Sequence, residues 1–111
     1  MFHGQYLAFM ERARTELLNQ AGIDIATFSE RHRLLFVVYE IHVRYHLPAR
    51  LNDLLSVSAE VATIGRASLL FRQSVERGTA RLVEAEITVA LVDRERMRPV
   101  RIPQELERAL T

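Results

Sequence analysis

The chain has 111 residues, of which 49% are hydrophobic and 26% are charged. This length and composition favour a single domain with one core and exclude a disordered chain. The formal net charge is +1, so the charge balance gives no reason to expect binding to nucleic acid or to a membrane surface.

Two absences narrow the function classes further. The chain contains no Cys, which excludes disulfides, a thiolate nucleophile and a Cys-based zinc site. No apolar run reaches membrane-spanning length, and the N-terminus lacks the apolar core and the cleavage site of a signal peptide. We therefore expect no membrane insertion and a cytoplasmic location.

The first predicted element is a long helix over residues 5–21. Apolar residues recur every three or four positions and give this helix one apolar face, formed by Tyr6, Phe9, Met10, Ala13, Leu17 and Ala21. Gly22 follows and suits the residue that ends a helix, because glycine adopts left-handed backbone angles at little cost. Between residues 23 and 33 we expect a short helical turn, capped by Thr27 or Ser29.

Four strands and a short helix follow. Alternation from Leu35 to His46, rich in β-branched and aromatic residues, predicts one long strand that Pro48 ends. Three more strands are predicted over residues 54–64, 67–76 and 81–93, with tight turns between them, and a short helix over 104–110. Short turns join antiparallel neighbours, and a lone helix buries its apolar face on a sheet. The sequence thus predicts one α+β domain over residues 1–111, with the long helix in the concave side of a curved antiparallel sheet.

Particular motifs carry a resemblance to a known family. The stretch "FHGQYLAFMERARTELL" resembles the "YHxxYLxFxERARTE" segment of the 4-hydroxybenzoyl-CoA thioesterase-like hotdog proteins, and among them most resembles the acyl-CoA thioesterases encoded beside the Tol–Pal genes. The stretches "YHLPARLNDLLSV", "GRASLLFRQSV" and "EAEITVALVDRERMRPVRIP" resemble the family patterns "YxxPARxDDxLxI", "GxTSLxFxQ" and "EAxVxxVxVDxxxxKPxxxP". The resemblance implies a hotdog fold, hydrolysis of a short- or medium-chain acyl-CoA or aroyl-CoA without a cofactor, and a homodimer or tetramer.

The resemblance also implies a site at the start of the long helix. In the family a segment "DTDxxGxVYH" precedes this helix, and its first Asp is the principal catalytic carboxylate. Phe2 and His3 match the last two residues of that segment, so the Asp is expected upstream of Met1. His3 is expected to position the thioester or its water, and the backbone N–H groups around Gly4 and Tyr6 to hold the oxyanion. Tyr6 is expected either to contact the substrate or to fill the core.

Three further residues are site candidates. Some hotdog branches place a catalytic Glu on the central helix, which makes Glu11 a candidate. A structural ion pair, with Arg14 or with a strand residue, is the favoured alternative because Glu11 lies two turns into the helix. Arg50 is expected to reach a CoA phosphate or a neighbouring carboxylate, and Ser68 to lie near the CoA arm. Five scattered arginines are expected either to attract the CoA phosphates or to be solvated without a specific role: Arg66, Arg72, Arg94, Arg96 and Arg98.

The long strand raises two more hypotheses. His42, Arg44 and His46 alternate on one of its faces and imitate a metal site, but no carboxylate or Cys has the supporting spacing, so we expect no metal. The strand also presents an edge unless it is paired, and hotdog proteins pair two such sheets into a dimer whose active sites lie between subunits.

Competing functions stay open. The chain is either an acyl-CoA thioesterase or an inactive, CoA-binding scaffold or partner module without the catalytic Asp. A hotdog dehydratase, a third class, needs a His on a different loop and a different helix signature.

Overall fold

The computed structural model describes residues 3–48 and 54–111, with side chains from Tyr6 onward. The described chain folds into three helices and one four-stranded antiparallel sheet with strand order β1-β4-β3-β2. The elements are α1 (His3–Gln20), α2 (Ile25–His32), β1 (Leu34–Tyr45), β2 (Ser56–Ile64), β3 (Ser68–Arg77), β4 (Ala80–Asp93) and α3 (Gln104–Leu110). No helix of this described part is long and apolar enough to cross a membrane.

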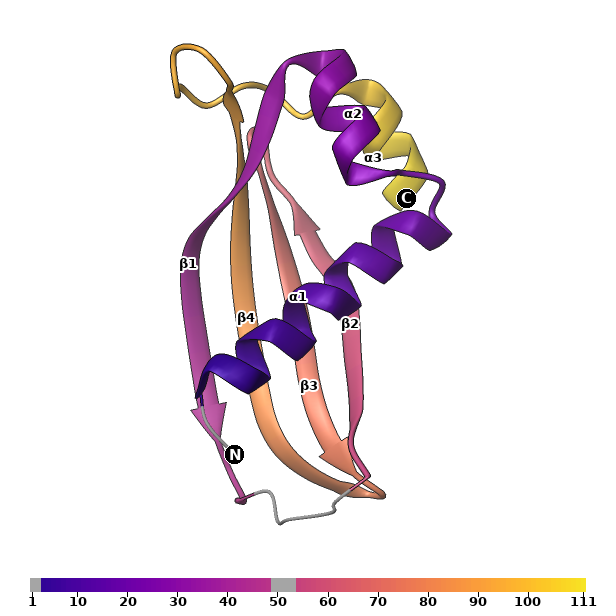
Figure 1. Ribbon diagram of the computed structural model, residues 1–111, viewed down its shortest axis with the longest axis vertical. Coiled ribbons are helices and arrows are strands. Elements are labelled where there is room, and N and C mark those ends of the chain that lie inside the picture. The colour runs from indigo at the N-terminus through magenta and orange to yellow at the C-terminus, as the bar shows by residue number, and fades with distance from the viewer. Residues whose placement is uncertain (1–2, 49–53) are drawn as a thin grey trace.

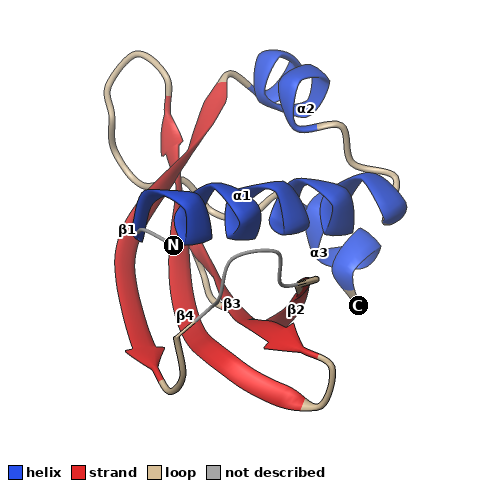
Figure 2. Cartoon of the chain, turned by 60° about the horizontal axis from the view of Figure 1, so that its bottom comes forward, coloured by secondary structure: helices blue, strands red, loops and turns tan. Residues whose placement is uncertain are grey.

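The predicted α+β layering is confirmed: α1 crosses the inner, concave face of the curved sheet (Figures 1 and 2). Met10 and Leu18 of α1 are buried in one hydrophobic core with inward residues of β3 and β4, and Phe28 of α2 is buried in the same core. The inward residues of these two strands alternate along the chain and form nearly half of the buried core: Leu69, Phe71, Val75, Val83, Ala85, Ile87, Val89 and Leu91.

The two ends of the sheet differ in the elements that lie at them. At the hairpin end, β1 finishes at Tyr45 and β3 turns into β4, and α1 begins there (Figure 1). At the opposite end, β1 starts at Leu34, which pairs with Asp93 at the finish of β4. The helices α2 and α3 lie toward this opposite end.

The end of α1 follows from its sequence. Gly22 takes a φ of 89°, which glycine adopts at little cost. The Gly22 N–H donates to the Asn19 carbonyl at 3.0 Å and the Ile23 N–H to the Leu18 carbonyl at 2.8 Å. This is a Schellman motif, and its apolar contact is supplied by Leu18 and Ile23, which are both buried in the core.

The start of α2 differs from the prediction. The helix begins at Ile25 with Asp24 as its N-cap residue, so the expectation of a cap at Thr27 or Ser29 is wrong. Thr27 instead donates its hydroxyl to the Asp24 carboxylate at 3.0 Å. The cap moves toward the N-terminus because Ile25 and Phe28 then share the face that packs on the core.

A bulge changes which residues of β1 face the core. The register of β1 on β4 shifts between Val38 and Glu40, which leaves Tyr39 as the extra residue. Phe36 and Val38 face inward before the bulge, whereas Ile41 does so after it. The simple alternation read from the sequence therefore breaks at Tyr39, although the predicted long strand is confirmed.

A buried polar link joins α1 to the sheet. Gln73 of β3 is 2% exposed and donates its amide N–H to the Met10 carbonyl at 2.9 Å. Arg14 donates to the Gln73 amide oxygen at 2.8 Å. Burial lowers the pKa of Arg14, and the nearby Glu11 carboxylate partly offsets that effect. Because a buried amide costs free energy unless it is hydrogen-bonded, Gln73 favours one placement of α1 on the sheet.

We predict that Gln73→Leu lowers the free energy of unfolding by about 1–3 kcal/mol, because it leaves the half-buried Arg14 guanidinium without its acceptor. The double variant Arg14→Met with Gln73→Leu should recover much of this loss, since both partners are then apolar. Urea unfolding measures both values, with Arg12→Met on the exposed side of α1 as the control. A double variant as unstable as the sum of its single changes contradicts the prediction.

Candidate active site

The first turn of α1 offers hydrogen-bond donors that the helix cannot use itself. The helix begins at His3, so the N–H groups from His3 to Tyr6 have no acceptor within α1 that precedes them by four helical residues. The helix dipole adds partial positive charge at the same place. Backbone donors and a dipole of this kind suit an oxygen that becomes negative during a reaction. Gly4, the second residue of α1, belongs to this turn.

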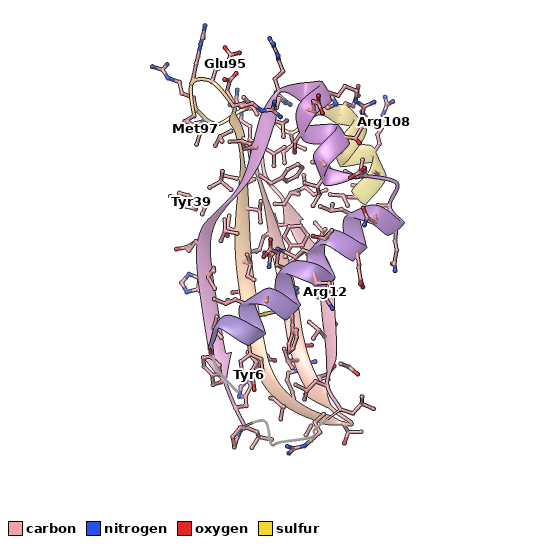
Figure 3. The ribbon with its side chains drawn as sticks, viewed as in Figure 1. Tyr6, Arg12, Tyr39, Glu95, Met97 and Arg108 are labelled. Atoms are coloured by element: carbon pink, nitrogen blue, oxygen red, sulfur yellow. The ribbon has the colours of Figure 1, made fainter. Side chains whose placement is uncertain are left out.

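An aromatic contact fixes the start of α1 at the hairpin end. Tyr6 is 4% exposed, and its ring centroid lies 5.9 Å from that of Tyr45, with the planes tilted by 52°. Tyr45 is the last residue of β1 and pairs with Val83 of β4. Figure 3 shows Tyr6 below the first turns of α1 at this end. This burial agrees with the core role that was one of the two expectations for Tyr6.

Three predicted site residues are described only through their backbone or not at all. His3 and Gly4 are the first two residues of α1, and their backbone lies at the helix start, as predicted. The side chain of His3 and the whole of Arg50 lie outside the described residues. Their roles remain predictions from the resemblance.

Glu11 lies away from the helix start. Its side chain is exposed, on the side of α1 that faces solvent. Arg14 turns inward to Gln73 instead, so the expected Glu11–Arg14 ion pair is not formed between these two described residues. The sequence spacing allows the pair, but the buried Gln73 amide offers Arg14 a better-placed acceptor.

The structure does not bring Ser68 to the start of α1. Ser68 is the first residue of β3 and pairs with Ala90 near the opposite end of the sheet. It shares its side of β3 with Arg72 and Ser74, because side chains alternate along a regular strand. That side is the outer face of the sheet, away from α1. Within one chain, Ser68 and Tyr6 are therefore separated along the sheet and across it.

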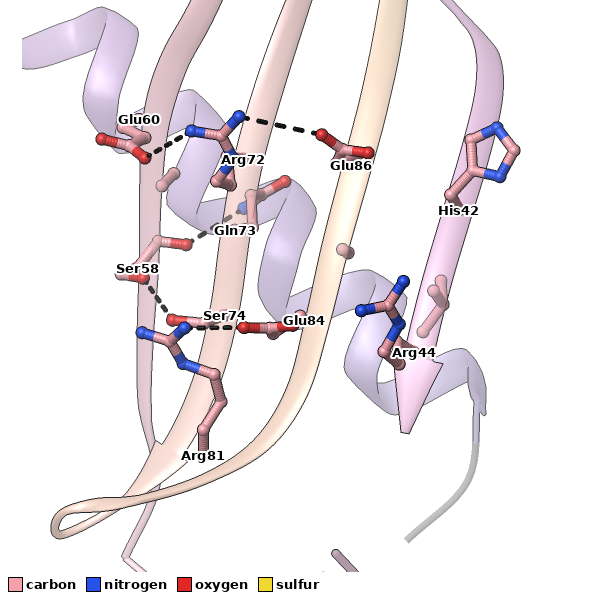
Figure 4. Close-up of a pocket in the computed structure, with 13 residues that line it drawn as sticks. His42, Arg44, Ser58, Glu60, Arg72, Gln73, Ser74, Arg81, Glu84 and Glu86 are labelled. Carbon is pink, nitrogen blue, oxygen red and sulfur yellow. Dashed lines mark hydrogen bonds and ion pairs between the residues drawn. The ribbon is translucent and has the colours of Figure 1, made fainter. Parts of the chain in front are cut away.

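A groove of about 720 Å³ lies on the outer face of the sheet (Figure 4). Ser58 and Ser74 share a hydroxyl hydrogen bond of 2.7 Å at its centre. Above them, Arg72 lies 3.5 Å from Glu60 and 3.8 Å from Glu86. The groove is separated from the start of α1 by the sheet itself, so it is not the pocket in which the α1 donors would act.

The charges of this groove largely neutralise one another. Arg81 donates to Glu84 at 2.7 Å and His46 lies 3.2 Å from the same carboxylate, and these two contacts hold the pKa of Glu84 below its ordinary value. His42 lies 3.3 Å from Glu40 of its own strand. Exposed pairs of this kind contribute little to stability. The His42, Arg44 and His46 face is thus a polar outer surface, and no cluster among the described residues has the three ligands that a metal ion needs.

Gln73 is a buried polar residue that the sequence analysis missed. The signal was present, because Gln73 occupies an inward position in the alternation of Leu69, Phe71 and Val75. A polar residue at such a position predicts a buried partner. The identity of that partner, the Met10 carbonyl, depends on how α1 lies on the sheet, which the sequence does not specify.

Comparison with protein families gives a match over most of the chain. The family model described as the thioesterase superfamily matches residues 1–84. The chain is also 40% identical over 109 residues to the acyl-CoA thioesterase YbgC of Haemophilus influenzae. This alignment covers 98% of the chain and 80% of that protein.

Solved structures share the fold. The hypothetical protein TT1821 from Thermus thermophilus superimposes with a TM-score of 0.87 at 31% identity, over 99% of this chain and 83% of that one. A probable thioesterase from Bartonella henselae superimposes with a TM-score of 0.83 at 29% identity, over 93% of this chain and 85% of that one. The helix that crosses a curved antiparallel sheet is therefore common to this chain and to those proteins.

Proposed function

Because the chain belongs to the thioesterase superfamily, we propose that it hydrolyses acyl-CoA thioesters. The observation that carries the proposal is the start of α1, where N–H donors that have no acceptor within the helix meet the hairpin end of the sheet. The substrate class follows from the named activity of the Haemophilus relative. A short- or medium-chain acyl group or an aroyl group is the expected acid part, and a CoA thioester substrate favours a cytoplasmic location.

The proposed reaction places the thioester carbonyl at the first turn of α1. Water attacks the carbonyl carbon, and the new C–O bond turns the carbonyl oxygen into an oxyanion that the N–H groups near Gly4 and Tyr6 stabilise. The tetrahedral species collapses as its C–S bond breaks, and the sulfur takes a proton to leave as free CoA. His3 orients the carbonyl or the water. By the resemblance, the base that removes the proton from water is the loop Asp that precedes Phe2 in the family.

We predict that His3→Ala lowers kcat by about 10–100-fold, because the reacting atoms lose a positioning contact. Release of free thiol from a panel of acyl-CoA and aroyl-CoA substrates measures this effect. His42→Ala, on the outer face of β1, is the matched control and should stay within about twofold. Equal losses in the two variants contradict the assignment of His3. Saturable CoA binding without thiol release from any substrate supports the scaffold function instead.

The presence or absence of the catalytic Asp most clearly separates a thioester hydrolase from a CoA-binding scaffold. A longer form, translated in frame from codons upstream of Met1, should contain the family segment and hydrolyse acyl-CoA. Asp→Asn in that segment should then lower kcat by about 10²–10⁴-fold, as expected for loss of a general base. A stop codon next to Met1, together with no turnover by the 111-residue chain, contradicts the hydrolase proposal.

We predict that Glu11→Gln keeps kcat and KM within about twofold of the parent protein, since Glu11 is exposed and lies away from the first turn of α1. The same thiol-release assay measures it, with Glu16→Gln, a second exposed residue of α1, as the matched control. A loss of activity that is confined to Glu11→Gln makes Glu11 part of the catalytic machinery.

We also propose that two copies of the chain pair along β1. This strand is 12 residues long, lies at one edge of the sheet and has β4 as its neighbour. Several of its apolar residues remain exposed, including Tyr39 at 75% and Val38 at 44%. A long apolar edge invites a second strand.

Pairing of this kind gives Ser68 a role that one chain alone does not. Two-fold pairing of antiparallel strands sets the hairpin end of one subunit beside the opposite end of the other. The sheet end that carries Ser68 then approaches the start of α1 in the partner. This supports an active site between subunits, in a dimer or in a tetramer of two such dimers.

We predict that Val37→Lys with Tyr39→Lys converts the assembly to monomers, because edge lysines oppose strand pairing. Light scattering after size-exclusion chromatography gives the masses, and thiol release should fall together with the mass. The matched control is Ser56→Lys with Thr63→Lys on β2, the other edge of the described sheet. A parent protein that is already monomeric, or a β1 variant that keeps its mass, overturns the pairing.

A further inference from the structure

A second bulge shapes the hairpin end of the sheet. Consecutive residues of β3 pair with Val83 and with Arg81 of β4, which leaves Leu82 as the extra residue. In a regular strand Arg81 and Glu84, three positions apart, would point to opposite faces. The bulge turns both side chains to the outer groove, where the Arg81 guanidinium donates to one Glu84 carboxylate oxygen at 2.7 Å (Figure 4).

Glu84 also holds the end of β1. Its second carboxylate oxygen lies 3.2 Å from Nε2 of His46, the first residue after this strand. The backbone reinforces the contact, because the Leu82 carbonyl, at the bulge, accepts the N–H groups of His46 at 2.8 Å and of Leu47 at 3.3 Å. We call Arg81, Glu84 and His46 the outer clasp.

The outer clasp acts on the inner face of the sheet through Tyr45. Side chains alternate along a strand, so a contact that fixes His46 on the outer face also fixes Tyr45 on the inner face. There the Tyr45 ring packs on Tyr6 of α1, with 5.9 Å between the ring centroids. Tyr6 is 4% exposed, whereas Tyr45 is 45% exposed and ends its strand. Burial in the core therefore holds Tyr45 less firmly than it holds Tyr6.

Stability of the whole fold does not explain the outer clasp. The side chains of His46 and Glu84 are 38% and 36% exposed, and exposed ion pairs contribute little to the free energy of unfolding. The end of a strand, in contrast, opens locally at a small cost in free energy, so a few contacts decide how firmly it stays closed. The effect of the clasp is therefore local, at the end of β1 where Tyr45 lies.

We propose that the outer clasp positions the first turn of α1 for catalysis by holding Tyr45 against Tyr6. This inference rests on the proposed hydrolysis, in which the N–H groups of that turn bind the oxyanion. The clasp residues lie across the sheet from the reacting atoms, so they are positioning residues. Donors that move away from the oxyanion lose much of their effect, because catalysis depends on a geometry that is set before the reaction.

The tyrosine pair reports on the clasp without any turnover. The chain has three tyrosines and no Trp, so Tyr39→Phe leaves Tyr6 and Tyr45 as the source of the tyrosine signal in near-ultraviolet circular dichroism. In this background Glu84→Ala should lower the signal by about half or more, because the ring pair loses its fixed geometry. Glu84→Gln should keep most of it, since an amide oxygen still accepts a hydrogen bond. The matched control is Glu86→Ala, on the same face of β4, whose ion pair lies outside the clasp.

Thiol release from acyl-CoA measures the effect on catalysis. Glu84→Ala should lower kcat about tenfold and leave KM within about twofold, because the oxyanion donors move while the contacts to CoA stay in place. Glu84→Gln should regain most of the lost kcat, and Glu86→Ala should stay within about twofold of the parent in both constants. All three variants should melt within a few degrees of the parent, since the clasp is exposed.

An unchanged tyrosine signal in Glu84→Ala overturns the proposal, and so does an equal loss in Glu86→Ala. A lower tyrosine signal with an unchanged kcat also overturns it, because the ring pair then does not position the donors. A parent chain that releases no thiol contradicts the proposed hydrolysis and with it the catalytic role of the clasp. The tyrosine signal distinguishes this case, since it shows separately whether the clasp holds the ring pair.

Discussion

The placement of α1 on the sheet depends on the bond between the Gln73 amide and the Met10 carbonyl. Apolar burial holds the helix on the sheet but tolerates sliding, because the hydrophobic effect is not directional. A buried amide allows little sliding of the helix, because it costs free energy wherever its hydrogen-bond partner is absent. Gln73 and Arg14 thus fix where α1 lies along β3. The first turn of α1, whose N–H donors have no acceptor within the helix, is positioned beside Tyr45 as a consequence.

The two faces of the sheet are kept distinct by the bulge at Tyr39. Without the extra residue, the inward positions of β1 would change sides against β4, which alternates regularly from Val83 to Leu91. The bulge keeps Phe36 and Ile41 on the core side and sends His42 to the outer face. The outer face can then be lined by charges that pair across strands, such as Arg72 with Glu60 and Glu86.

The elements were predictable from the sequence because their signals are local. The period of α1, its end at Gly22 and the alternation of β4 each depend on a few neighbouring residues. The strand order, which pairs β1 with β4, depends on contacts distant in the chain and was not predicted. The site was only partly accessible for the same reason. Motif resemblance pointed to the start of α1, but neither the separate location of Ser68 nor the inward turn of Arg14 has a local signature.

Several residues break a local rule in this fold: Gln73 is polar in a core alternation, Tyr39 interrupts a strand, and Met97, like Arg33 at the end of α2, has a positive φ. A sequence that specifies one structure departs from such rules where another requirement is stronger. Placement of α1 accounts for Gln73, and the matching of two sheet faces accounts for Tyr39. The closure of the loop after β4 accounts for Met97, because its N–H donates to the Asp93 carbonyl at 2.8 Å and the Asp93 N–H donates to the carbonyl of the next residue, Arg98, at 2.7 Å. The positive φ of Met97 lets the chain make both of these backbone bonds and return to the sheet at Pro99.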